Sequence, residues 1–327
     1  MQERPTYRTP GLELVRITEA GAIAAAHWMG HGDNKRADQA AVEAIRAAMD
    51  QVAFNGTIVI GEGERDEAPM LYIGEKVGRG EGPEIHIAVD PLEGTNLVAQ
   101  GRANATAVIA VSEPGGLLHA PDTYMEKLIV GQPARGKVDL DRSVAENLRI
   151  IADSLNRDIE DLTVVILARE RHAQLIQDVR TAGARIKLID DGDLTAAISV
   201  GIAGTAVHAV MGTGGAPEGV LAAAALRCLG GEILARLKFR SDEERERAKK
   251  MGVTDERRIY RTEDLASGKD LRFIATGVTD GELLQGVRFF NKGVRTHSVL
   301  LDSSMGKLRF IDTHHFDDPE DPPIVRL

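Results

Sequence analysis

The sequence has 327 residues, of which 43% are hydrophobic and 28% charged, the balance of an ordinary globular protein with one or two domains. Its formal net charge of −10 argues against nucleic acid or an anionic membrane as a partner, because both require a basic surface. The single cysteine, Cys228, excludes an intrachain disulfide, and neither a signal segment nor an apolar run of about 18 residues is present, so we expect a cytoplasmic protein.

The first part of the chain predicts two helices followed by short strands. The helices are expected at residues 11–29 and 36–53, the second with the apolar period of 3.6, and a glycine-rich loop that contains Asp33 separates them. The strands are expected at Thr57–Ile60, Glu84–Val89 and Ala105–Val111. The strand Glu84–Val89 should stop at Asp90-Pro91, because proline fixes its own backbone angle and donates no hydrogen bond.

The second part of the chain alternates strands and helices more regularly. The strands are Thr163–Leu167, Arg185–Ile189 and Thr205–Met211, and the helices are Glu170–Thr181, Leu194–Val200 and Gly219–Leu229. This alternation indicates an α/β layer arrangement. The charged run 241–258 predicts a solvated helix and loop, and the acidic, proline-rich tail 317–327 predicts an extended surface segment. We place a domain boundary near residues 155–162, which divides the chain into halves 1–160 and 161–327.

Four acids occupy turns that could open onto a cleft. Asp33 lies in the glycine-rich loop, Glu62 directly follows the strand Thr57–Ile60, and Asp90 and Glu93 follow the next strand. Taken singly, Asp33 or Glu62 is more often a surface charge or a helix cap. Clustered carboxylates cannot all ionise unless cations lie among them, and oxygen ligands favour Mg²⁺ or Mn²⁺ over zinc.

The hexapeptide Asp90-Pro91-Leu92-Glu93-Gly94-Thr95 is the most specific signal in the sequence. It brings two acids, a glycine and a hydroxyl into one turn, a combination that packing alone rarely requires. The glycine allows close approach of a ligand, and Thr95 stands near a helix start whose free N–H groups suit an anion. Two metal ions held here would clamp a phosphate and activate water.

Four weaker signals suggest a sugar-phosphate site, and each has an ordinary alternative. Arg169 and Arg171 could fork onto a phosphate, but arginines on a helix surface are equally common. Asp191-Gly192-Asp193 could accept hydrogen bonds from sugar hydroxyls, or be a turn and helix cap. The segment Gly212–Gly215 could admit a substrate against the backbone or be a plain loop, and Tyr124 is more often a half-buried aromatic residue.

At these residues the sequence resembles the lithium-sensitive phosphatase superfamily, which includes inositol monophosphatases and fructose-1,6-bisphosphatases. The superfamily pattern appears as Gly61-Glu62-Gly63-Glu64, as Asp90–Thr95, and as Glu218 ahead of an alanine-rich helix. Glu93 replaces the usual aspartate and Pro217-Glu218-Gly219 replaces the usual Trp-Asp. Both departures are features of the class II (GlpX-type) fructose-1,6-bisphosphatases, and the similarity to that class runs over nearly the whole chain.

The resemblance implies a layered α-β-α-β-α sugar-phosphatase fold, with a metal-binding catalytic half, 1–160, and a sugar-phosphate-binding half, 161–327. It implies Mn²⁺ or Mg²⁺ held by Asp33, Glu62, Asp90, Glu93 and Glu218. The implied substrate contacts are Glu93, Gly94, Thr95, Tyr124, Arg169, Glu170, Arg171, Asp191, Gly192, Asp193 and Gly215. The implied catalytic residues are Thr95, Asp33 and Glu62, with Thr95 positioning the attacking water and helping to deprotonate it.

The activity that this resemblance implies is hydrolysis of fructose 1,6-bisphosphate to fructose 6-phosphate and phosphate, as in gluconeogenic or Calvin-type sugar metabolism, by a cytoplasmic dimer or tetramer. The nearest alternative is an enzyme that also accepts sedoheptulose 1,7-bisphosphate. An inositol-phosphate phosphatase is disfavoured by Glu93 and Pro217-Glu218. A non-catalytic sugar-phosphate sensor is disfavoured by the intact set of acids and by Thr95.

Overall fold

The computed structural model describes residues 11–63 and 68–318. Glu64 of the predicted Gly-Glu segment, and the part of the predicted extended tail from residue 319 onward, lie outside these ranges. Within them, none of the helices combines the length and the apolarity that crossing a lipid bilayer requires.

The larger of two sheets, here called sheet A, is assembled from two distant parts of the chain. Its eight strands follow the order β12-β13-β11-β4-β3-β1-β2, and β14 pairs with β13. These strands are β1 (Asn55–Ile60), β2 (Lys76–Val77), β3 (Glu84–Glu93), β4 (Thr106–Ser112), β11 (Arg272–Gly277), β12 (Arg288–Phe290), β13 (Gly293–Asp302) and β14 (Lys307–Phe316). The antiparallel pairing of β4 with β11 joins the two parts.

The smaller sheet, sheet B, contains the intervening strands in the order β10-β9-β5-β8-β6-β7. They are β5 (Tyr124–Val130), β6 (Thr163–Leu167), β7 (Arg185–Ile189), β8 (Ala209–Gly215), β9 (Glu232–Lys238) and β10 (Tyr260–Arg261). The chain therefore enters sheet B after β4 and returns to sheet A at β11. Sheet membership does not change at a single point of the chain, and the division into halves 1–160 and 161–327 stays a prediction.

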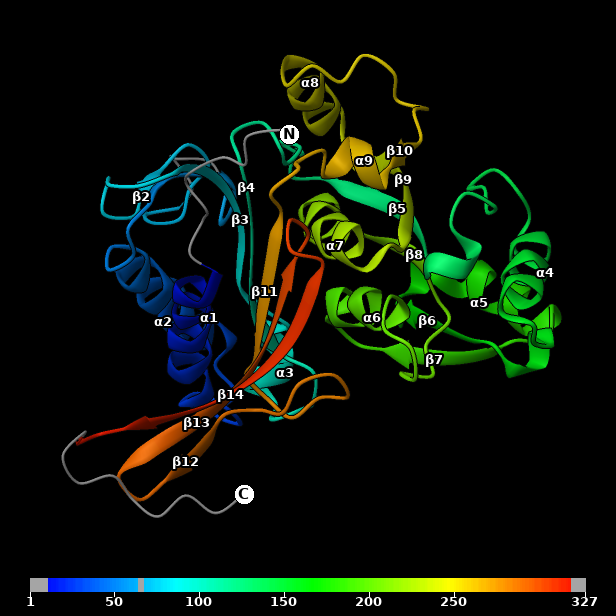
Figure 1. Ribbon diagram of the computed structural model, residues 1–327. Helices are drawn as coiled ribbons and strands as arrows, with labels where there is room; N and C mark the ends of the chain where they lie inside the picture. The colour runs from blue at the N-terminus through cyan, green and yellow to red at the C-terminus, as the bar shows by residue number, and fades with distance from the viewer. Residues whose placement is uncertain (1–10, 64–67, 319–327) are drawn as a thin grey trace.

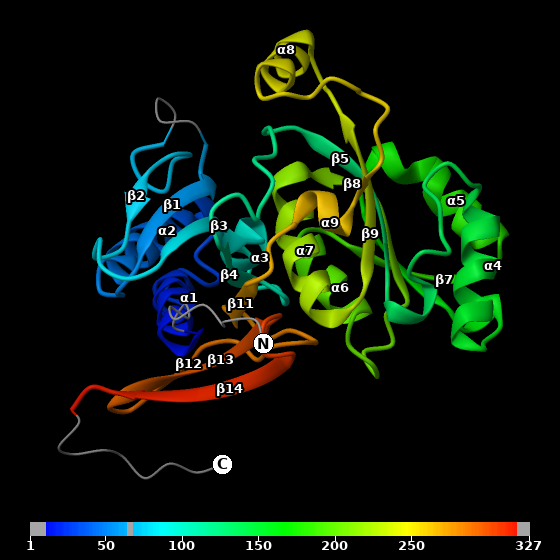
Figure 2. The same cartoon turned by 45° about the horizontal axis from the view of Figure 1, so that its top comes forward.

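Helices form three layers around the two sheets (Figure 1). The outer face of sheet A carries α1 (Gly11–Ala26) and α2 (Asn34–Met49), the space between the sheets holds α6 (Asp193–Val200) and α7 (Ala216–Leu229), and the outer face of sheet B carries α4 (Val144–Leu155) and α5 (Ala173–Thr181). Figure 2 shows the same succession from another direction. The predicted α-β-α-β-α layering is confirmed.

Helix α7 is the element that both sheets share. It contacts β3, β4, β11 and β13 of sheet A and β5, β8 and β9 of sheet B. Its run of alanines, from Ala222 to Ala225, is buried. Small side chains let two sheets approach one helix closely, so the alanine-rich sequence fixes the separation between the sheets and with it the width of any site between them.

The remaining helices are short connections. Helix α3 (Thr95–Ala99) follows β3, and α8 (Asp242–Lys250) and α9 (Thr262–Leu265) lie between β9 and β11. Three 3₁₀ turns cover Gln132–Ala134, Ile159–Asp161 and Glu170–His172. The solvated helix predicted within the charged run 241–258 is confirmed as α8, and the predicted helix at Glu170–Thr181 begins with the last of the 3₁₀ turns.

Two predicted strand boundaries are wrong. The strand expected to stop at Asp90-Pro91 continues to Glu93 as β3, and its pairing with β4 shifts between Asp90 and Glu93, which accommodates the proline. The strand expected at Thr205–Met211 is β8, four residues further on, so the segment Gly212–Gly215 is strand and not loop. Glycine suits this strand because a Cβ at Gly214 would lie only 2.8 Å from a carboxylate oxygen of Asp193.

Candidate active site

Three acids from two distant parts of the chain meet where β3 approaches α7. Asp90 and Glu93 lie on β3, and Glu218 lies in the first turn of α7. One carboxylate oxygen of each residue lies within 4.8 Å of the other two. Gly215 makes this possible, because a Cβ there would lie 1.9 Å from Oε2 of Glu218. The glycine before α7 therefore gives the third carboxylate room to join the first two.

These three carboxylates fit a divalent cation. Oε2 of Glu218 is buried and, among residues 11–63 and 68–318, has no hydrogen-bond partner; such an atom is costly unless a cation contacts it. Burial raises the pKa of Glu218 to about 7, although Lys127 acts in the opposite direction. Burial, and then the neighbouring Asp90, raises the pKa of Glu93 well above its usual value. A set of oxygen ligands suits a hard cation such as Mg²⁺ or Mn²⁺.

Glu62 and Asp38 extend the acidic group. A cavity of about 270 Å³ is lined by Glu62, Asp90, Asp122 and Glu218 among others. Burial, followed by the charges of Asp38 and Asp90, raises the pKa of Glu62 to about 8. Burial and the charge of Asp90 raise the pKa of Asp38 to about 6. Glu62 and Asp38 are therefore harder to ionise than usual, first because they are buried and then because other acids lie near them.

The carboxylate of Asp33, another predicted metal ligand, is engaged at the start of α2. It caps α2, accepting a hydrogen bond from the backbone N–H of Arg36 at 3.1 Å, and it also pairs with the Arg36 side chain at 3.4 Å. The loop before it is attached to α3, since the N–H of Gly32 donates to the carbonyl of Ala99 at 2.8 Å. Because α3 begins at Thr95, the two predicted catalytic residues Asp33 and Thr95 lie on segments that are joined by a backbone hydrogen bond.

Side-chain amides connect this region to the loop that contains Asp191. Asn34 donates to the amide oxygen of Asn96 at 3.0 Å, and Asn96 donates to Asp191 at 3.4 Å. A second link runs from the N–H of Leu194, in the first turn of α6, to a carboxylate oxygen of Glu93 at 3.4 Å. The predicted sugar-binding loop and the predicted metal ligand are therefore held against each other.

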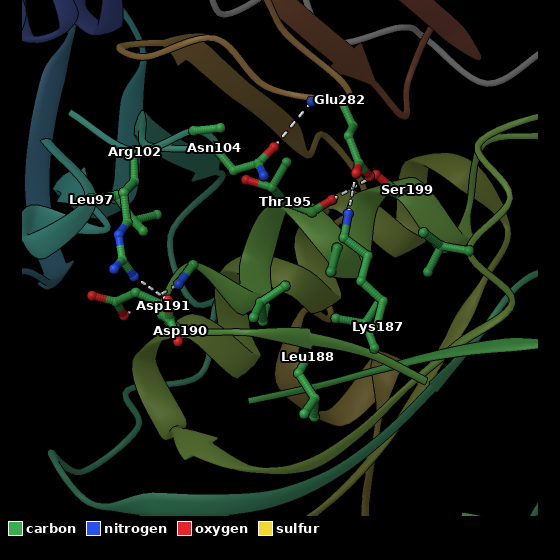
Figure 3. A pocket seen from close by; sticks show the side chains of 16 residues that line it. Leu97, Arg102, Asn104, Lys187, Leu188, Asp190, Asp191, Thr195, Ser199 and Glu282 are labelled. Atoms are coloured by element: carbon green, nitrogen blue, oxygen red, sulfur yellow. Dashed lines mark hydrogen bonds and ion pairs between the residues drawn. The ribbon is translucent and has the colours of Figure 1, made fainter. Parts of the chain in front are cut away.

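A second cavity, of about 210 Å³, adjoins the Asp191 loop (Figure 3). Two ion pairs cross it, Arg102 with Asp190 and Lys187 with Glu282. In each pair one residue belongs to a segment connected to sheet A, and the other lies on or just after β7 of sheet B. These two ion pairs add to the Asn96–Asp191 hydrogen bond in connecting β7 and the loop after it to segments attached to sheet A.

Asp193 and Lys127 form a buried ion pair between the acids and sheet B. The Lys127 ammonium lies 2.8 Å from Asp193, and the lysine side chain is only 3% exposed. Burial acts to lower the pKa of Lys127, but Asp193, Glu218 and Glu93 together raise it. Lys127 therefore stays charged, offsets part of the negative charge of the site, and fixes the carboxylate of Asp193.

Tyr124 and Arg171 are also brought together. Tyr124 begins β5 directly opposite Gly215 of β8. The guanidinium of Arg171 lies 4.8 Å from the centroid of the Tyr124 ring and donates two hydrogen bonds to the carbonyl of Thr213, at 2.8 and 3.1 Å. The ring and the carbonyl fix the position of the guanidinium.

Arg169 and Glu170 are not brought into this arrangement. Arg169 donates to the carbonyl of the adjacent Ala168 at 3.2 Å, and Glu170 is exposed. Within residues 11–63 and 68–318, neither makes a side-chain hydrogen bond or an ion pair with another predicted site residue. Gly94 and Gly192, in contrast, both adopt positive φ, 88° and 77°, and start α3 and α6 as only glycine does without strain.

Two residues of the candidate site, Asp38 and Lys127, were not predicted from the sequence. Asp38 precedes Ala41 by three positions and Ile45 by seven, so the period of α2 places an acid on its buried face. Lys127 alternates with the buried residues Met125 and Ile129, which places a lysine on the inward face of β5. A charged residue at an inward position was the signal in both cases.

Changing Glu62 to Gln should alter the pH dependence of stability in the metal-free protein. The raised pKa means that protonated Glu62 stabilises the fold below about pH 4.5, and that this stability is lost as the pH rises through about 8. Glu62→Gln carries no such charge, so it should be more stable than wild type at pH 8 to 9, with the difference shrinking toward pH 4.5.

The measurement is the free energy of unfolding in urea, in the presence of a chelator, at several pH values. Glu160→Gln, at an exposed position, is the matched control and should follow the wild-type curve. A Glu62→Gln curve that runs parallel to wild type would contradict the assignment of Glu62 to the acidic group.

Comparisons with known proteins identify the family to which this chain belongs. A family model described as bacterial fructose-1,6-bisphosphatase, glpX-encoded, matches residues 8–315. The D-fructose 1,6-bisphosphatase class 2/sedoheptulose 1,7-bisphosphatase of Synechococcus sp. (strain JA-3-3Ab) is 51% identical, over 97% of this chain and 98% of its own length. Proteins of the same name from Crocosphaera subtropica and Synechocystis sp. are 50% and 49% identical, each over 98% of this chain and 99% of their own length. The chain therefore belongs to the bacterial, glpX-encoded fructose-1,6-bisphosphatase family.

Proposed function

We propose that this protein hydrolyses the 1-phosphate of fructose 1,6-bisphosphate, with Mn²⁺ or Mg²⁺, to give fructose 6-phosphate and phosphate. The observation that carries the proposal is the meeting of Asp90, Glu93 and Glu218, with the unpartnered Glu218 oxygen among them. Because the relatives are also named as sedoheptulose 1,7-bisphosphatases, that bisphosphate is the second candidate substrate.

On this proposal, the cation is held by Asp90, Glu93 and Glu218 together with Glu62, and Asp33 completes the set from its loop. The bound cation supplies charge that neutralises the phosphate and lowers the pKa of water. Thr95, at the start of α3, orients the attacking water. Glu62 lines the acidic cavity and is placed to accept a proton there; Asp33 is assigned to the same catalytic group.

The sugar end of the substrate lies against sheet B. Asp191 and Asp193 accept hydrogen bonds from sugar hydroxyls, and their orientation is fixed by Asn96 and Lys127 respectively. The substrate also meets the backbone at three glycines and the side chains at one end of sheet B, namely Gly94, Gly192, Gly215, Tyr124, Arg169, Glu170 and Arg171. Glu93 contacts both the cation and the sugar, which is consistent with its bond to the first turn of α6.

We further propose a cytoplasmic homo-oligomer, a dimer or a tetramer. The strands β12, β13 and β14 extend past α1 as a ribbon (Figures 1 and 2). Within the residues that the structure describes, β14 pairs only with β13, and its Leu308 and Phe310 are 40% and 46% exposed. A free sheet edge that carries apolar side chains is usually covered in the native state, here by a second copy of the chain.

Sedimentation velocity should therefore give a dimer or a tetramer. Phe310→Lys places a charge on the free edge and should shift the distribution toward monomer. Lys307→Glu, a charge change at the polar end of the same strand, is the control. A monomeric wild type would contradict the proposal, and an unchanged Phe310→Lys variant would place the interface elsewhere.

The activity itself should depend on a divalent cation. Exhaustive chelation should abolish phosphate release from fructose 1,6-bisphosphate, and Mn²⁺ or Mg²⁺ should restore it, because the clustered carboxylates require a cation to remain charged. The measurement is a phosphate-release panel of fructose 1,6-bisphosphate, sedoheptulose 1,7-bisphosphate and inositol monophosphate. Full activity in verified metal-free protein would contradict the mechanism, and binding without release would indicate a sensor.

Thr95→Ala should lower kcat by about 10²–10⁴-fold, because the hydroxyl acts only as the transition state forms. KM should change much less. Thr95→Ser retains the hydroxyl and should recover most of the rate, and the exposed Thr254→Ala should leave the rate unchanged. A folded Thr95→Ala enzyme with nearly normal kcat would remove Thr95 from the mechanism.

A further inference from the structure

A second arginine, from a distant segment, lies over the Tyr124 ring. The guanidinium carbon of Arg240 is 4.6 Å from the ring centroid, and that of Arg171 is 4.8 Å from the same centroid. The two guanidinium carbons are therefore at most about 10 Å apart. Arg240 lies between β9 and α8, and Figures 1 and 2 both place α8 beyond the neighbouring ends of β5 and β9. Nothing in the sequence pattern connects these two arginines.

Arg240 is held in place by Glu244. Its side chain donates to one oxygen of Glu244 at 2.5 Å, and its backbone N–H donates to the other at 2.8 Å. Thr123, the neighbour of Tyr124, donates to the second oxygen at 2.7 Å. The Glu244 carboxylate is buried, while the Arg240 side chain is 48% exposed. The arginine is thus fixed at its base and open to a ligand at its outer edge.

Arg171 contributes a positive charge that is not paired with an acid among the described residues. In the part of the chain that the structure describes, its guanidinium forms no ion pair, and its hydrogen bonds go only to the neutral carbonyl of Thr213. Besides Glu244, the exposed Asp122 also raises the pKa of Arg240 by its charge. Two guanidinium groups around one ring, with a single buried counter-ion, favour an incoming anion.

The position of this pair matches the far end of a substrate. Tyr124 pairs directly with Gly215, where an added Cβ would lie 1.9 Å from the Glu218 carboxylate. Strand β8 leads into α7 and Glu218, and the neighbouring strand β5 begins with Tyr124, whose ring contacts the two arginines. A sugar bound with one phosphate at the acids would extend its other end toward them.

Tyr124 and Arg171 are already assigned to the substrate under the proposed function. We propose that Arg240 joins them at the phosphate that is not cleaved, and that Arg240 strengthens the preference of the enzyme for sugar bisphosphates over monophosphates. This inference rests on the proposed function, because it takes the acidic group as the place of the reacting phosphate. It assigns the segment between β9 and α8 to the substrate site, where the sequence shows only the start of a solvated charge run.

The test compares ligands that differ in which phosphate they carry. Fructose 6-phosphate has only the non-reacting phosphate, and fructose 1-phosphate has only the reacting one. Arg240→Ala should weaken the binding of fructose 6-phosphate about 10- to 150-fold, the loss expected for one charge-assisted contact. It should lower kcat/KM for fructose 1,6-bisphosphate by a similar factor, mainly through KM, and should change kcat/KM for fructose 1-phosphate less than about threefold.

Arg245→Ala is the matched control. Arg245 also lies over an aromatic ring, that of Phe239, at 5.7 Å, and pairs with Glu256 on the same surface segment. The Arg245→Ala variant should bind fructose 6-phosphate as the wild type does, and its kcat/KM for fructose 1,6-bisphosphate and fructose 1-phosphate should be unchanged. Because Arg240→Ala leaves Glu244 buried without its partner, the double variant Arg240→Gln/Glu244→Gln is measured as well, together with thermal unfolding of each variant. The double variant should show the same selective loss without the loss of stability.

Equal losses on both monophosphates, in the single variant and in the stable double variant, would overturn the assignment. The titration of fructose 6-phosphate needs no turnover, so it separates this inference from the proposed function. A wild type that releases no phosphate, yet binds fructose 6-phosphate through Arg240, would end the proposed reaction and leave the phosphate pocket standing. An active wild type whose Arg240→Ala variant is unchanged toward every ligand would overturn the role of Arg240 and leave the proposed reaction standing.

Discussion

Repulsion among buried carboxylates is the constraint around which the rest of this structure is arranged. Asp90, Glu93 and Glu218 are forced together by elements of two different layers, and burial raises the pKa of each. An arrangement of this kind is unfavourable until positive charge enters it. Lys127 supplies part of that charge from sheet B, and a cation bound at Oε2 of Glu218, which has no hydrogen-bond partner among the described residues, would supply the remainder.

The scaffold tolerates this repulsion because rigid connections hold the acids in place. Helix α7 packs against both sheets through small side chains and so sets the position of Glu218. The chain from Asn34 through Asn96 to Asp191, and the bond from Leu194 to Glu93, connect loops that would otherwise be independent. Strain and repulsion at a functional site usually depend on such surrounding support.

The sequence predicted the parts of the site that are encoded locally. The hexapeptide Asp90–Thr95 could be interpreted alone, because proline, glycine and the spacing of the acids specify a turn at a strand end. Glu218 could be assigned only through the family resemblance, since no local pattern relates it to Asp90. Asp38 and Lys127 were not predicted because a single charged residue on a buried face only interrupts the hydrophobic period of its own helix or strand. The residues that interact with each of them lie on other elements.

The fold was predicted to a similar extent. The layering followed from strand and helix alternation together with the resemblance, but β11 to β14 were not predicted, and the return of the chain to sheet A was not foreseen. Pairing of β4 with β11 depends on contacts between residues that are far apart in sequence, and no pattern within either strand identifies its partner. The contact of Arg240 with Tyr124 could not be predicted for the same reason, because the two residues are far apart in sequence and meet only in the folded chain.

Sheet A combines strands from distant parts of the chain, and this has a consequence for folding during synthesis on the ribosome. Strand β4 is made early, yet its partner β11 begins about 160 residues later. At the usual rate of about 5–20 residues per second, a ribosome needs roughly 8 to 30 seconds to supply that partner. During this interval the edge of β4 that later pairs with β11 has no partner strand. All strands of sheet B emerge within that same interval, so this sheet can form first and offer α7 as a surface on which the late strands close the molecule.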